Sequence, residues 1–130
     1  MKLGCNTAFV AIADLDGYTL RTFYQALLGI NPTIDQPGQY AEFQVPGLRI
    51  GLFKPKDINK AEFADSSKGS LSICLEVDHL ETAIAHLKTL GYPPTTPIQS
   101  ASHGREIYIY DPQGNRLILH ESRGVGVANT

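Results

Sequence analysis

The chain has 130 residues, of which 42% are hydrophobic and 18% are charged, and its formal net charge is −2. This length and composition predict one compact domain with a true apolar core and argue against disorder. There is no run of basic residues and no apolar stretch near the roughly 20 residues of a membrane span. We therefore expect neither a nucleic-acid-binding protein nor a membrane protein.

The two cysteines and the first residues of the chain indicate the cellular compartment that we expect. Cys5 and Cys74 are the only cysteines, they lie far apart, and they form no CxxC pair. The first five residues are too few and too polar to be a signal peptide. We expect a cytoplasmic protein with reduced thiols, and we expect both cysteines to be packing residues.

The first half of the chain predicts a strand, a helix and three further strands. Residues 7–13 are rich in Val, Ile and Phe, which is typical of a strand. The helix that follows has apolar residues at i, i+3, i+4, i+7 and i+8 and ends at Gly29. Residues 33–38 predict an edge strand, and residues 40–45 and 48–53 predict a hairpin. The apolar stripe of the helix consists of Leu20, Phe23, Tyr24, Leu27 and Leu28.

The second half repeats this order of elements. Residues 71–77 predict a strand, and residues 78–81 (Asp-His-Leu-Glu) have the pattern of a capping box before a helix. Three prolines then limit the next segment to extended or edge geometry. A hairpin is predicted over 106–110 and 116–121, around a turn with Pro early and Gly late. Asp16 and Gly29 recur 62 residues later as Asp78 and Gly91, which indicates a duplicated unit.

Each copy predicts a βαβββ module, in which one helix covers one face of a sheet. We place module one at about residues 5–54, the connection at about 55–69, module two at about 70–121 and an unpatterned tail at 122–130. Two such modules form an α+β fold. We expect their strands to make a curved mixed sheet around a ligand-sized cavity, with the helices outside.

Three features of the chain are shared with one large superfamily. They are the duplication, the end of the first helix, and the final hairpin, and together they span about residues 5–121. On these features the chain resembles the vicinal oxygen chelate superfamily, which includes glyoxalase I, bleomycin-resistance proteins and extradiol dioxygenases. The resemblance implies a homodimer, but members range from metal-dependent enzymes to metal-free drug-binding proteins, so fold alone does not choose a function. The two motifs read Phe23-Tyr24-x-x-x-Leu28-Gly29 and Tyr108-x-x-Asp111-Pro112-x-Gly114-Asn115-x-Leu117-x-Leu119.

The resemblance implies metal ligands of the His, Glu or Gln type on the first and last strands of each module. In the second module these positions hold Ser72 and Ile118. In the first module, residues 6–10 offer only Asn6, a poor ligand, and the last strand carries Arg49 and no carboxylate. We therefore predict that the usual metal site is absent, and we assign no metal and no cofactor.

Strand alternation predicts which side chains line the cavity instead. Glu106 and Tyr108 share one face of their strand, and Ile118 and His120 share one face of the next, whereas Glu121 points the opposite way. Tyr108 matches a cavity tyrosine of the related fosfomycin-resistance enzymes. The same residues are also compatible with ordinary strand or surface roles. The predicted ligand-binding residues are Arg49, Phe53, Glu106, Tyr108, Ile118 and His120.

The favoured function is metal-free binding of a small organic molecule in the cavity between the modules, with no catalytic residue assigned. Two alternatives stay open. One is a glyoxalase-like lyase or dioxygenase-like enzyme that uses displaced ligands such as His103, Glu106 or His120 with a metal, or acid–base chemistry without one. The other is a structural or regulatory partner protein with a filled cavity.

Overall fold

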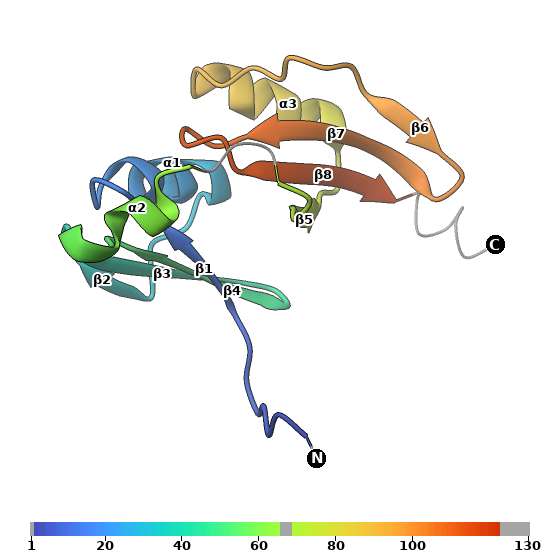
Figure 1. Ribbon diagram of the computed structural model, residues 1–130. Helices are drawn as coiled ribbons and strands as arrows, with labels where there is room; N and C mark the ends of the chain where they lie inside the picture. Colours follow the sequence, from blue (N-terminus) through green and yellow to red (C-terminus); the bar gives the residue numbers. More distant parts are fainter. Residues whose placement is uncertain (1, 66–68, 123–130) are drawn as a thin grey trace. The chain divides into compact units, whose positions relative to one another are not determined.

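The computed structural model describes residues 2–65 and 69–122, and the chain divides into two compact units, Met1–Asp65 and Ser66–Thr130 (Figure 1). The division falls inside the predicted connection. Ser122, which we assigned to the tail, belongs to the last strand, and the rest of the predicted tail lies outside the described residues.

The first unit contains a ten-residue helix, α1, and a four-stranded mixed sheet. The strand order is β1-β4-β3-β2, in which β1 runs parallel to β4 and the other neighbours are antiparallel. A short 3₁₀ turn, Asp57–Asn59, and a one-turn helix, α2 (Lys60–Phe63), follow the sheet. The main elements are β1 (Val10–Ala13), α1 (Thr19–Leu28), β2 (Ile34–Gln36), β3 (Tyr40–Val45) and β4 (Leu48–Phe53).

The second unit repeats this topology, with the strand order β5-β8-β7-β6 and β5 parallel to β8. The prediction of an α+β fold built from two tandem βαβββ modules is thus confirmed, as two four-stranded mixed sheets. The cavity between the modules stays a prediction. The elements are β5 (Ile73–Glu76), α3 (Leu80–Thr89), β6 (Gln99–Ala101), β7 (Gly104–Tyr110) and β8 (Arg116–Ser122).

Each unit has its own core, formed where the helix covers one face of the sheet (Figure 1). In the second unit Leu80 and Leu87 of α3 are almost fully buried, together with alternate residues of β7 and β8. Fully burying such a side chain contributes about 1.5–3 kcal/mol. Alternation places the even-numbered residues of β7 and β8 on the opposite face. The buried apolar residues of β7 and β8 are Ile107, Ile109, Leu117 and Leu119.

The turn between β7 and β8 explains the most specific motif of the sequence. Asp111 is buried, and its Oδ1 accepts hydrogen bonds from the backbone N–H groups of Gln113 and Asn115, at 2.9 and 3.0 Å. Its Oδ2 accepts one from the Asn115 side chain at 2.9 Å. Gly114 has φ of 89°, a conformation that glycine adopts at little cost. The motif therefore fixes the length and geometry of this turn.

The start of α3 differs from the predicted capping box. The N-cap residue is His79, and its side chain makes no capping hydrogen bond. Instead the N–H of Leu80 donates to Oε2 of Glu121, a residue of β8, at 2.8 Å. The carboxylate of Glu81 pairs with Arg105 at 2.7 Å. The predicted capping box was wrong. Glu121 accepts the hydrogen bond from the first N–H of the helix, and the Glu81 carboxylate pairs with Arg105 instead of reaching back to the cap.

No helix in residues 2–65 or 69–122 combines the length and the apolar character needed to span a membrane.

The Arg105 ion pairs make part of the stability depend on pH. Arg105 lowers the pKa of Glu81 from 4.5 to about 2, and the Leu80 N–H followed by Arg105 lowers the pKa of Glu121. Because these pKa values are depressed on folding, the stabilisation is present above pH 4.5 and is lost as the pH falls towards 2.

In Glu81→Gln we expect the free energy of unfolding to change less steeply with pH over this range, measured by urea unfolding. Glu62→Gln, which changes an exposed glutamate of α2, is the matched control. Equal slopes in all three proteins would contradict the assignment.

Candidate functional site

The face of the second sheet opposite α3, which we term the open face, carries a row of polar side chains. Cross-strand pairing puts Glu106 of β7 opposite His120 of β8, and His120 opposite Glu76 of β5. Gln99 of β6 pairs with Glu106 on the other side. All four strands therefore contribute one residue to the same row.

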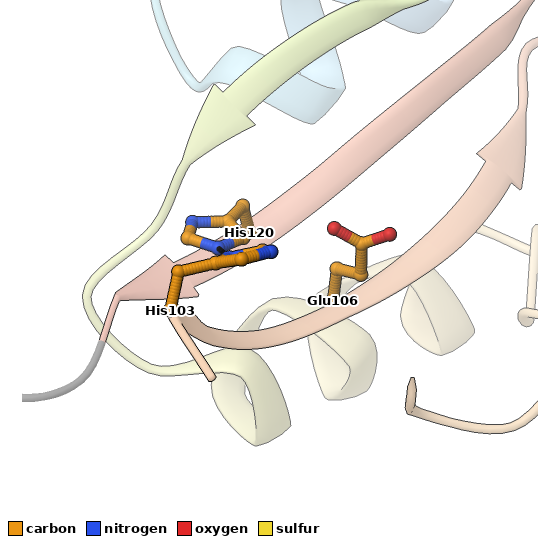
Figure 2. Close-up of side chains that lie close together, drawn as sticks. All are labelled: His103, Glu106 and His120. Atoms are coloured by element: carbon orange, nitrogen blue, oxygen red, sulfur yellow. Dashed lines mark hydrogen bonds between the residues drawn. The ribbon is translucent and has the colours of Figure 1, made fainter. Parts of the chain in front are cut away.

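Two histidines meet at this row. His103 lies in the turn between β6 and β7, and its Nδ1 is 2.8 Å from Nε2 of His120. The two rings stack with centroids 4.9 Å apart and planes at 29°. Figure 2 shows the Glu106 carboxylate beside them, and the ligand atoms of the three residues all lie within 4.8 Å of one another. His120 is buried, Glu106 half-buried and His103 exposed.

A hydrogen bond to Glu76 fixes the orientation of the His120 ring. Nδ1 of His120 is hydrogen-bonded to Oε1 of Glu76, and the Ser122 hydroxyl donates to Oε2 of the same carboxylate at 2.9 Å. An ionised carboxylate only accepts, so Nδ1 of His120 carries a proton. In the neutral ring Nε2 then has a free lone pair, which accepts a hydrogen bond from Nδ1–H of His103.

The open face changes character along the strands. Ile118 of β8 pairs with Tyr108 of β7 on one side and with Cys74 of β5 on the other. Arg116 of β8 pairs with Tyr110 of β7. Tyr108 and Ile118 are half-buried. Arg116 and His120 are four positions apart on β8, which is about 13 Å along the strand. The face is thus apolar and aromatic in the middle and polar at both ends.

The two positions of the second module at which the resemblance implies metal ligands, Ser72 and Ile118, do not fit a cation. Nε of Arg116 donates to the Ser72 hydroxyl at 2.7 Å, and the same guanidinium is hydrogen-bonded to the Gly69 carbonyl. Ser72 is therefore engaged by a positive charge. Ile118 offers no donor atom at all. A divalent ion at these positions would meet repulsion and an apolar side chain.

The predicted ligand-binding residues fall into two groups. Glu106, Tyr108, Ile118 and His120 lie together on the open face of the second sheet. Arg49 and Phe53 belong to β4 of the first unit, and the alternation of the strand puts them on one face. The structure brings the four residues of the second unit together as expected.

Arg49 and Phe53 both have partners within the first unit. The Arg49 guanidinium lies over the Phe9 ring, 4.4 Å from its centroid, and its Nε is 3.8 Å from Oε2 of Glu42. The Phe53 ring packs edge-on against Phe63 of α2, with centroids 5.2 Å apart. Arg49 is therefore held by a cation–π contact and a long ion pair, which are also the contacts of a residue with a structural role.

The predicted site omitted Glu76 and misjudged the cysteines. Alternation along residues 71–77 puts Ser72, Cys74 and Glu76 on one face, so Glu76 could have been included from this pattern. Cys5 and Cys74 are both exposed, so the prediction that they are packing residues was wrong. Partial desolvation of the thiol, followed by the carboxylates of Glu76 and Glu106, raises the pKa of Cys74.

Gly104 joins His103 to β7 and tolerates no side chain. Its φ is 146°, and a Cβ atom would lie 2.2 Å from the carbonyl oxygen of Glu121. We expect Gly104→Ala to lower the free energy of unfolding by roughly 1–3 kcal/mol, measured by urea unfolding. Gly69→Ala is the matched control, because Gly69 has no positive φ and nothing within 4 Å. It should change stability by no more than about 0.5 kcal/mol. Equal effects of the two variants would mean that the close approach at Gly104 is not a constraint.

Solved structures with the same fold come from several bacteria. Protein ATC0852 of Agrobacterium tumefaciens has a TM-score of 0.71 and 21% identity, over 89% of this chain and 96% of that chain. Lactoylglutathione lyase of Agrobacterium tumefaciens has a TM-score of 0.67 and 20% identity, over 92% and 96% of the two chains. The fosfomycin resistance protein FosX of Listeria monocytogenes has a TM-score of 0.70 and 16% identity, over 92% and 95%. At these identities the likeness concerns the fold.

No curated protein matches the chain. The family model described as Glyoxalase/Bleomycin resistance protein/Dioxygenase superfamily matches residues 8–119, which is most of both units. The chain therefore belongs to the glyoxalase/bleomycin resistance protein/dioxygenase superfamily.

Proposed function

We propose that this protein binds a small organic molecule on the open face of the second sheet, without a metal at the positions that the superfamily usually uses. The observation that carries the proposal is the surface formed by Tyr108 and Ile118, half-buried between polar groups at both ends. Ligand surfaces commonly combine an apolar, aromatic lining with a few polar groups that orient the ligand.

The residues of this surface suit an amphipathic aromatic ligand. Contact with the aromatic rings and the isoleucine would remove apolar surface from water, and each Å² removed contributes about 25 cal/mol. Covering about 100 Å² therefore contributes about 2.5 kcal/mol. Arg116 lies one row beyond Ile118 and attracts an anionic or oxygen-rich group. The distance of about 13 Å between Arg116 and His120 accommodates a ligand of two fused or linked rings.

We favour binding over metal-dependent chemistry because of the side chains that this chain has at Ser72 and Ile118. Lactoylglutathione lyase and FosX are similar to this chain in fold alone. In this chain Ser72 is engaged by a guanidinium and Ile118 has no donor atom, so the usual metal-dependent chemistry has no support at these two residues.

The proposal includes a homodimer in the cytoplasm. Several large apolar side chains are exposed in the single chain, among them Leu3, Ile58 and Leu71, at 93%, 88% and 90%. A second copy is one way to cover such side chains. Light scattering after size-exclusion chromatography should give about twice the mass of the 14.2 kDa chain. A monomer mass at 100 µM protein would rule out the dimer without affecting the ligand surface.

Titration with 8-anilinonaphthalene-1-sulfonate, an amphipathic aromatic anion, tests the ligand surface. In EDTA-containing buffer we expect amide chemical-shift changes in ¹H–¹⁵N NMR spectra to concentrate on β5, β7 and β8, with a Kd of about 10–100 µM. Ile118→Ser should raise this Kd about tenfold, because it removes apolar contact from the middle of the surface.

Ile58→Ser is the matched control, because it removes an isoleucine that is 88% exposed in the first unit. It should leave the Kd unchanged. The proposal fails if both variants bind the probe equally well, or if the shift changes follow exposed apolar residues throughout the chain.

A further inference from the structure

We infer that His103, Glu106 and His120 form a binding site for one divalent transition-metal ion, at positions other than those the superfamily usually uses. Two imidazole nitrogens and one carboxylate oxygen form a donor set that Zn²⁺, Fe²⁺ and Co²⁺ bind well. The three residues come from the turn before β7, from β7 itself and from β8, and their ligand atoms lie within 4.8 Å of one another.

The arrangement behind His120 is the one that metal-binding histidines usually have. A ligating histidine typically donates its second ring N–H to a carboxylate, which fixes the tautomer and raises the basicity of the ligating nitrogen. Here Nδ1 of His120 is hydrogen-bonded to Glu76, and Ser122 holds the other oxygen of that carboxylate. Nε2 of His120 therefore presents its lone pair towards His103 and the open face.

The distances require only small movements of the three side chains. Ligand atoms bound at about 2.1 Å to a tetrahedral ion lie about 3.4 Å from one another. The two histidine nitrogens are 2.8 Å apart, so the ion would replace the proton between them with a slight separation of the rings. His103 would carry its proton on Nε2 instead, which costs little because this residue is exposed. Glu106, on a half-buried strand position, would close the remaining gap by a change of rotamer.

The local charge favours a cation at this end of the face. Glu76 and Glu106 flank His120 in the same row and bring two carboxylates to it. Arg116 on the same face is about 13 Å away along β8, which exceeds the Debye length of about 8 Å at physiological ionic strength. Arg105 lies on the opposite face and is paired with Glu81 and Glu121. Neither arginine opposes a cation at the site.

An ion held by three protein ligands keeps at least one position open. The site borders the surface of Tyr108 and Ile118, so an oxygen-bearing organic ligand on that surface would be able to fill the open position. This last step rests on the proposed function, whereas binding of the ion by the three residues does not depend on it.

Titration with Co²⁺ tests the metal site directly. Both exposed cysteines are first replaced, as Cys5→Ser and Cys74→Ser, so that thiolates do not bind the ion. Calorimetry and the visible absorption of Co²⁺ should then show one ion per chain. His103→Gln and Glu106→Gln should each weaken binding at least tenfold, and Glu76→Gln should weaken it about tenfold through the orientation of His120.

His86→Gln is the matched control, because His86 is an exposed histidine on α3, away from the open face. It should leave the affinity for Co²⁺ unchanged. The inference is overturned if no stoichiometric binding occurs, or if His103→Gln and Glu106→Gln bind Co²⁺ as tightly as His86→Gln. The sulfonate titration is performed in EDTA and the Co²⁺ titration without the sulfonate, so failure of one proposal is distinguishable from failure of the other.

Discussion

The register between β7 and β8 is the constraint on which the second unit depends. Successive residues of a strand point to opposite faces, so a shift of one residue would exchange the two faces of β7 relative to β8. In the observed register Ile107 pairs with Leu119 in the core, and Glu106 pairs with His120 on the open face. The turn built around Asp111 sets this register, because its carboxylate holds the backbone N–H groups of Gln113 and Asn115. One short motif therefore determines both the packing of the core and the composition of the candidate site.

The same alternation lets neighbouring residues serve different purposes. Glu121 turns to the helix side, where it caps α3 and pairs with Arg105. His120, one residue earlier, turns to the open face and meets His103. The residue that caps α3 and the residues of the core lie on the helix side. Few side chains of the open face are therefore needed to hold the fold together. The residues of the open face can consequently change in chemistry while the fold is preserved.

Much of the fold could be predicted because its signals are local. The hairpin of β3 and β4 has the predicted limits, 40–45 and 48–53, and alternation alone placed Glu106 and His120 on compatible faces. The features that were missed depend on residues far apart in sequence. The acceptor for the Leu80 N–H comes from 41 residues away, and the contact between Glu76 and His120 spans 44. Parallel pairing of β5 with β8 produces both, and no local periodicity reveals which residues such pairing makes neighbours.

The two copies of the module show how one backbone carries different chemistry. The N–H of Asp14 donates to the Phe53 carbonyl at 2.8 Å, as the N–H of Val77 does to the His120 carbonyl, so Phe53 is the counterpart of His120. By the same register Ala13 is the counterpart of Glu76. The first unit therefore has an apolar pair where the second has a histidine and its carboxylate partner.

This asymmetry bears on how the loss of the usual ligands is interpreted. Ile118 and His120 are two residues apart on β8 and thus share one face. Donor atoms that Ile118 does not offer are present one row further along, at His120, where Glu106 lies opposite and His103 alongside. Ile118 itself offers no donor atom, whereas the orientation of His120 by Glu76 is consistent with the metal site that we infer one row further along the strand.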